Sequence, residues 1–158
     1  MKKFIIIALL AVMTALGARA EAGDFSVGGQ FVYASKHSMA GVGLQLQYEP
    51  ITNWRLAPEF IYYFKNDGLS AYNVNANIHF VIPTSHSFAI YPLAGFSYAH
   101  YEADTGYVGT SVSRCGANVG LGAQYLIKDH LHFYTEQRFH ILKDFNQSVT
   151  VLGLKYSF

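Results

Sequence analysis

Six charged residues share the polar side of an alternating sequence pattern, and they are the first candidates for chemistry. They are Glu49, Arg55, Glu59, Glu136, Arg138 and Lys155. Three positive charges balance three negative ones, with Glu49 near the end of its segment. An isolated charge held away from water is costly, so we expect these side chains to pair as an ion-pair network. The last two predicted strands are neighbours, so Glu136 or Arg138 could reach Lys155.

Histidine is the second residue type that could carry chemistry, with seven copies in the chain. His132 and His140 share one face of a predicted strand, and the eight residues between their positions correspond to roughly 26 Å of extended chain. One metal ion cannot contact both, so we expect no metal site and no cofactor.

A hydrolase requires a nucleophile, a base and an orienting carboxylate. His100 is the best candidate for the base, because Ser97 and Glu102 lie close to it in sequence. The alternative is a solvated histidine at an interface. We prefer that alternative and expect no catalytic residue.

The single cysteine, Cys115, cannot pair within the chain, which excludes a disulfide-stabilised scaffold. Its position in the alternation predicts that it faces the apolar side, where a thiol behaves as a small hydrophobic group.

Composition narrows the class of protein further. The chain has 158 residues, of which 51% are hydrophobic, 16% aromatic and only 13% charged. Disordered chains are charge-rich and poor in aromatic residues, so disorder is excluded. A formal net charge of +1 without a basic run argues against nucleic-acid binding. The length suits one domain.

The first 20 residues have the pattern of a secretory signal peptide. Lys2 and Lys3 precede an apolar run over residues 4–13, and Ala18-Arg19-Ala20 forms a cleavage site. Ala20-Glu21-Ala22 is a second possible site. The apolar run is too short to span a bilayer comfortably. We therefore expect residues 1–20 to be removed, leaving a domain over residues 21–158 with a formal net charge of −2.

The rest of the chain alternates between apolar and polar residues, which is typical of β-strands. For example, Val42, Leu44 and Leu46 alternate with glycine and glutamine. Eight segments of roughly ten residues follow this pattern: 24–34, 41–49, 54–64, 71–82, 87–101, 114–127, 131–141 and 148–158. Pro58 and Pro92 fall inside two of them, where we expect bulges or local breaks.

Alternation alone does not decide which face is buried. The polar face consists mainly of glycine, asparagine, glutamine and serine, which suits a narrow lumen better than a soluble surface. Aromatic residues gather near segment ends, and tilted strands of about ten residues match a bilayer. The sequence therefore predicts an all-β fold, an eight-stranded antiparallel transmembrane up-and-down β-barrel. A soluble periplasmic barrel is the alternative.

An even number of strands places both termini on the periplasmic side. We expect short periplasmic turns at 50–53, 83–86 and 128–130. Outer loops should then lie at 35–40, 65–70, 102–113 and 142–147. The third of these is the longest, and its glycine, threonine and serine content marks it as a loop.

The C-terminal segment carries a more specific resemblance. The chain ends Leu154-Lys-Tyr156-Ser-Phe158, which resembles the C-terminal signal of outer-membrane barrels. The runs Tyr91–Tyr98 and Gly116–Tyr125 are similar to those of "porin family" barrels. The resemblance to eight-stranded OmpA/OmpX-type barrels covers residues 21–158. It implies recognition of Leu154, Tyr156 and Phe158 by the barrel-assembly machinery.

That family includes adhesins, structural proteins, small-molecule channels and lipid A-modifying enzymes, so membership does not assign an activity. We expect a non-enzymatic, structural or porin-like protein of the Gram-negative outer membrane, most simply a monomer. Its partners would be outer-membrane lipid and lipopolysaccharide. Eight strands leave an interior that side chains just fill, so the ion-pair network should plug the lumen. The alternatives are a gated channel for small solutes and a lipid A-modifying enzyme.

Overall fold

The computed structural model describes residues 23–36, 38–66, 68–104, 109–142 and 146–158. The expected signal peptide lies outside the described residues. The strands are β1 (Phe25–Ala34), β2 (Met39–Ile51), β3 (Trp54–Asn66), β4 (Leu69–Phe80), β5 (Ile82–Pro83), β6 (Phe88–Asp104), β7 (Gly109–Lys128), β8 (Leu131–Leu142) and β9 (Gln147–Ser157). Within these residues, no helix is long and apolar enough to cross a membrane.

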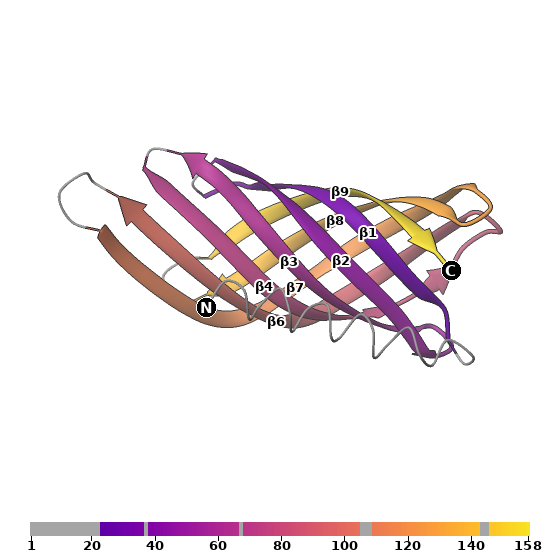
Figure 1. The fold of residues 1–158 in the computed structure, drawn as a ribbon. Helices are drawn as coiled ribbons and strands as arrows, with labels where there is room; N and C mark the ends of the chain where they lie inside the picture. The colour runs from indigo at the N-terminus through magenta and orange to yellow at the C-terminus, as the bar shows by residue number, and fades with distance from the viewer. Residues whose placement is uncertain (1–22, 37, 67, 105–108, 143–145) are drawn as a thin grey trace.

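The eight long strands form a closed antiparallel barrel, as the alternation predicted. Consecutive long strands pair with each other, and β1 closes the circle by pairing with β9, from Ser26↔Ser157 to Ala34↔Val149. Figure 1 shows the strands tilted around the barrel, with the C-terminus at the same end as the short turns. We call this the terminal end, and the opposite end the loop end.

The turns at the terminal end are short. The β2–β3 and β7–β8 connections are residues 52–53 and 129–130, inside the predicted turns. Asn53 and Asp129 take positive φ there, a conformation that Asn and Asp tolerate in tight hairpins. The predicted strand 71–82 is split, because β4 ends at Phe80 and β5 pairs separately with the start of β6.

The two prolines interrupt pairing without shifting the register. Opposite Pro58, the pairing of β2 with β3 stops after Gln45↔Glu59 and resumes in the same register at Tyr48↔Leu56. Pro92 faces the gap between β4 and β5, while its pairing with β7 is continuous. Proline lacks the N–H that a ladder needs on one side, so local breaks occur and the expected bulges do not.

The predicted outer loop 102–113 is largely part of the sheet. β6 and β7 continue as a paired hairpin through Glu102↔Ser111, Ala103↔Thr110 and Asp104↔Gly109. This hairpin extends beyond the other strands at the left of Figure 1. Small polar residues indicated a loop in the sequence, but they also fit a ladder that continues past the apolar part of the barrel. Residues 105–108 lie outside the described part.

Candidate functional site

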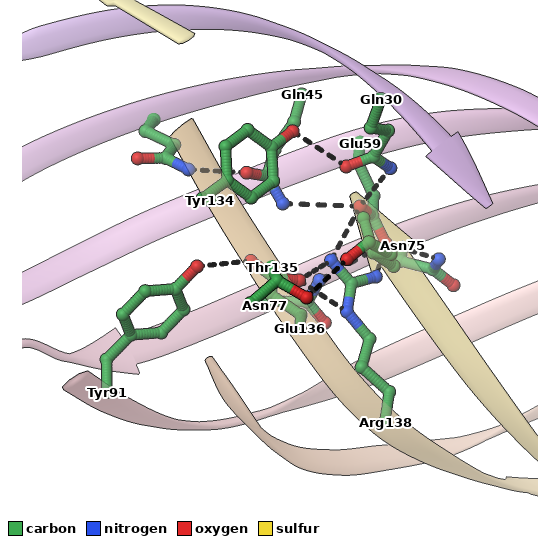
Figure 2. Close-up of polar contacts among 12 residues, drawn as sticks. Gln30, Gln45, Glu59, Asn75, Asn77, Tyr91, Tyr134, Thr135, Glu136 and Arg138 are labelled. Atoms are coloured by element: carbon green, nitrogen blue, oxygen red, sulfur yellow. Dashed lines mark hydrogen bonds and ion pairs between the residues drawn. The ribbon is translucent and has the colours of Figure 1, made fainter. Parts of the chain in front are cut away.

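An ionic layer crosses the middle of the barrel interior. Arg138 of β8 extends between the carboxylates of Glu59 on β3 and Glu136 on β8, as Figure 2 shows. Its Nε donates to Glu136 Oε2 at 2.6 Å, and one Nη donates to Glu59 Oε2 at 3.0 Å. All three side chains are fully buried. Arg138 therefore links β8 to β3 on the opposite wall of the lumen.

Neutral donors complete the hydrogen bonding of Glu59. Its carboxylate accepts hydrogen bonds from Gln30 at 2.8 Å, Asn75 at 2.7 Å, and Gln45 and Asn77 at 3.3 Å each. Burial of a carboxylate is tolerated when hydrogen bonds replace its hydration in this way. The alternation predicted that these amides face inward, but it could not show that they surround one carboxylate.

Two inward tyrosines extend the network to other strands. Tyr91 Oη on β6 donates to Glu136 Oε1 at 2.8 Å, and Tyr134 Oη on β8 donates to Gln30 Oε1 at 2.9 Å. Side-chain contacts thus run without interruption from Tyr134 through Gln30, Glu59, Arg138 and Glu136 to Tyr91. The sequence did not single out these tyrosines, because they occupy alternate strand positions that otherwise carry polar residues.

Glu49, Arg55 and Lys155 form a second cluster nearer the terminal end, and Gln47 and Gln45 link its lysine to Glu59 by hydrogen bonds. Arg55 donates to Glu49 Oε1 at 2.7 Å and to Gln124 at 2.9 Å. Lys155 Nζ donates to Gln47 at 2.7 Å and to Gln124 at 2.8 Å.

The expectation that Lys155 bonds Glu136 or Arg138 is wrong, because strand register separates them. Lys155 lies opposite His132, whereas Glu136 and Arg138 lie opposite Val151 and Val149. Glu136 and Arg138 are therefore at a different height in the barrel from Lys155. Two glutamines take the place of a carboxylate around the ammonium group.

An apolar layer closes the lumen on the loop side of Arg138. Its members occupy inward positions that the alternation assigned to polar residues, and they pack as one cluster. The larger ones are Val32, Met39, Ile61, Tyr63, Tyr101, Leu142, Val149 and Val151, each less than 9% exposed. This layer was not predicted. The available signal was that apolar residues occur on both sides of the alternation in residues 149–152, with Val149 and Val151 on one side and Leu152 on the other.

An open vestibule occupies the terminal end. A cavity of about 430 Å³ is lined by Glu49, Arg55, His132 and Lys155 among others. Its inner wall is the Arg55–Gln124–Lys155 cluster, so water can enter from this end as far as that cluster, whereas the Arg138 layer deeper in the barrel is fully buried. The two ends of the lumen therefore differ: the terminal end is polar and open, whereas the loop end is filled by buried side chains, mostly apolar but with His140 and Asn118 among them.

The sequence candidates for hydrolysis are divided between the two faces of β6. Ser97 is buried in the lumen, whereas His100 points outward, because residues an odd number apart face opposite sides of a strand. Ser97 is therefore not the partner of His100. Ser113 on β7, which sequence reasoning missed, lies opposite His100 in the ladder and contacts it. Cys115 is exposed on the same outer face.

The outer wall is apolar over most of the barrel. Large hydrophobic side chains are exposed on β1, β2, β3, β4, β6, β7, β8 and β9, including Leu44 at 58% and Leu121 at 67% exposure. Leu154, Tyr156 and Phe158 belong to this surface. Soluble monomers rarely expose one contiguous apolar band of this size. A closed barrel that is apolar outside and polar within is the arrangement of a transmembrane β-barrel.

Comparison with known proteins gives the family. The model of the outer membrane protein beta-barrel domain matches residues 4–158, so the chain belongs to that family. No curated protein matches the chain by sequence.

Solved structures share the fold. The N-terminal β-barrel domain of Pseudomonas aeruginosa OprF is 12% identical, with a TM-score of 0.74 over 87% of this chain and 98% of that one. Neisserial surface protein A is 16% identical, with a TM-score of 0.67 over 86% and 97% of the two chains. OprG of Pseudomonas aeruginosa is 14% identical, with a TM-score of 0.64 over 87% and 96%.

Proposed function

We propose that this chain is a structural barrel of the Gram-negative outer membrane whose lumen is closed to solutes. The observation that carries the proposal is the Arg138 layer, in which one guanidinium joins Glu59 and Glu136 across the lumen. The apolar layer beyond it forms a second barrier. An ion entering from the vestibule would have to displace the salt bridges and then lose its water among aliphatic side chains, which is costly.

The proposal includes location and partners. Residues 1–20 would direct export and be removed, and the mature barrel would insert with its terminal end toward the periplasm. The assembly machinery would recognise Leu154, Tyr156 and Phe158, which lie on the outward face at the end of the chain. Lipid and lipopolysaccharide would surround the apolar wall, and the barrel would act as a monomer without a cofactor.

Planar-bilayer recording of the purified mature protein tests the closed lumen. We expect no steady current steps from the wild-type barrel. Arg138→Ala should also stay silent, because the apolar layer remains in place. Gln137→Ala is the matched control, since Gln137 neighbours Arg138 in sequence and faces outward. Heat-dependent mobility on gels would verify that each variant is folded.

A small-solute channel is the second candidate. The vestibule of about 430 Å³ favours it, because it already opens one end of the barrel as far as the cluster of Arg55 and Lys155. A channel would require Arg138 to leave Glu59. Resolved current steps in the wild type, altered by Arg138→Ala and unchanged by Gln137→Ala, would replace the closed-lumen proposal with this one.

A further inference from the structure

A cluster of four polar side chains lies on the outer wall where β6 and β7 approach the loop end. Ser113 Oγ contacts His100 Nδ1 at 2.8 Å, and His100 Nε2 lies 3.5 Å from Glu102 Oε1. Tyr98 Oη donates to Ser113 Oγ at 3.1 Å. The ring of Tyr72 on β4 covers the imidazole, with centroids 5.0 Å apart. None of these groups takes part in the lumen network.

The arrangement brings together the groups that acyl transfer uses. A nucleophile contacts a base, a carboxylate lies 3.5 Å from the other nitrogen of the base, and a hydroxyl donor lies beside the nucleophile. Strand register produces it, because His100 lies directly opposite Ser113 and directly opposite Tyr72. Outward positions on β6 then place Tyr98 and Glu102 on either side of His100.

The height of the cluster in the barrel indicates its substrate. Phe96 and Tyr98 are the outward residues just below His100, and aromatic residues form girdles at the membrane interface. The acyl esters of membrane lipids lie at the same boundary between hydrocarbon and head groups. Ser113 is exposed there, whereas the lumen is closed to a lipid.

We propose that Ser113, His100 and Tyr98 form a catalytic site that hydrolyses acyl esters of outer-leaflet lipids, with Glu102 as a positioning residue. This activity goes beyond the structural role proposed above, and it shares with that proposal only the orientation of the barrel. The shared chemistry of the substrate is a fatty acyl ester, which both glycerophospholipid and lipopolysaccharide carry.

The reaction balances with water as the second substrate. Ser113 Oγ attacks the ester carbonyl carbon while its proton passes to His100 Nδ1, and Tyr98 donates a hydrogen bond to the resulting oxyanion. The carbon–oxygen bond to the lipid alcohol then breaks, and His100 returns the proton to that oxygen. Water attacks the acyl-serine in the same manner, releasing the fatty acid and restoring the Ser113 hydroxyl. Glu102 holds the imidazole through Nε2 and stabilises its charged form.

Release of fatty acid from defined vesicles tests the proposal. The full mature barrel is reconstituted separately with phosphatidylethanolamine and with lipopolysaccharide, and free fatty acid is measured by mass spectrometry. We expect release in at least one arm, and the arm identifies the lipid. Ser113→Ala and His100→Ala should lower the rate at least about 10³-fold, and Tyr98→Phe about 10²-fold.

Two further measurements distinguish a catalytic role of these residues from a structural one. A fluorophosphonate should label Ser113 covalently in the wild type and in Ser97→Ala, but not in Ser113→Ala or His100→Ala. Glu102→Gln should lower kcat and change its pH profile, and Glu102→Asp should restore part of the rate. Heat-dependent gel mobility establishes that each variant is folded. Folded wild type that neither releases fatty acid in either arm nor reacts with the phosphonate would overturn the proposal.

Discussion

At the scale of single residues, the lumen depends on ion pairs and hydrogen bonds that stabilise buried charge. Arg138 pairs with two carboxylates in a fully buried layer, which leaves one net negative charge there, and Gln30 and Asn75 donate hydrogen bonds to Glu59. Removing one partner of a buried ion pair leaves an uncompensated charge, which costs about 3–5 kcal/mol, whereas replacing the whole set with apolar or neutral groups costs far less.

The first prediction concerns Arg138→Met. This variant should lower the free energy of unfolding by about 3–5 kcal/mol, measured by urea denaturation in lipid vesicles. The triple variant Glu59→Gln, Glu136→Gln, Arg138→Met should recover much of that loss. A triple variant as unstable as the single one would show that packing, not charge, dominates the layer.

A second prediction compares the two charge clusters. Arg55→Met removes the partner of Glu49, whose side chain is 22% exposed at the vestibule and can be hydrated. The loss of stability should therefore be closer to the roughly 1 kcal/mol typical of solvent-accessible pairs. Equal losses for Arg55→Met and Arg138→Met in the same denaturation assay would contradict the difference in hydration between the clusters.

At the scale of strands, small inward residues make room for large ones on the next strand. Tyr91 lies opposite Gly122, and Tyr134 lies opposite Gly153. A Cβ added to either glycine would overlap the facing tyrosine ring. The rings can therefore lie flat across the neighbouring strand, where their hydroxyls reach Glu136 and Gln30. The pairing of glycine with tyrosine is thus part of the lumen network.

The third prediction uses this packing. Gly153→Ala should destabilise the barrel by about 1–3 kcal/mol, because the added methyl group displaces the ring of Tyr134. Gly29→Ala is the control, since nothing lies within 4 Å of its added Cβ. Thermal unfolding in vesicles measures both. Similar melting temperatures for the two variants would contradict the proposed close packing.

At the scale of the whole molecule, closure gives each of the eight long strands a partner on both sides, so the barrel should resist denaturation until all strands separate. The last residue takes part in closure, since the backbone N of Phe158 donates to Phe25 O at 2.9 Å. Its side chain is 73% exposed and contacts the rings of Phe25 and Tyr156 on the outer wall. The backbone bond does not depend on the side chain. A side-chain substitution at Phe158 therefore separates its role in closing the barrel from its proposed role in assembly.

The fourth prediction follows from that separation. Phe158→Ala keeps the backbone bond, so refolding into vesicles and the heat-dependent gel shift should resemble the wild type. The amount in the outer-membrane fraction of cells should fall several-fold. Phe139→Ala, another outward phenylalanine, serves as the control. Equal losses in cells and in refolding would indicate a packing role for Phe158 and argue against recognition by the assembly machinery.

Processing supplies the fifth prediction. Intact-mass measurement of the protein from outer membranes should give a chain that begins at Glu21, or at Gly23 if the second cleavage site is used. A mature protein that keeps residues 1–20 would contradict the signal-peptide interpretation.

The local alternation of apolar and polar residues was enough to predict the strands and the face of the sheet on which most side chains lie. Alternation has period two in any strand, so Leu44 and Glu59 could be assigned to opposite faces from sequence alone. The small number of charged residues and the many aromatic residues then indicated that the apolar face is the outer one. The hairpin at 102–113 was missed because short polar residues fit both a loop and a ladder beyond the membrane.

The register and closure of the barrel decided everything that depends on contact between distant strands. Alternation places Glu59, Arg138 and Lys155 inside, but only the closed barrel sets Arg138 beside Glu59 across the lumen and Lys155 beside two glutamines. The register of β6 against β7 places Ser113 beside His100. The face of a side chain is a property of its own strand, whereas its height relative to other strands arises only when the sheet closes.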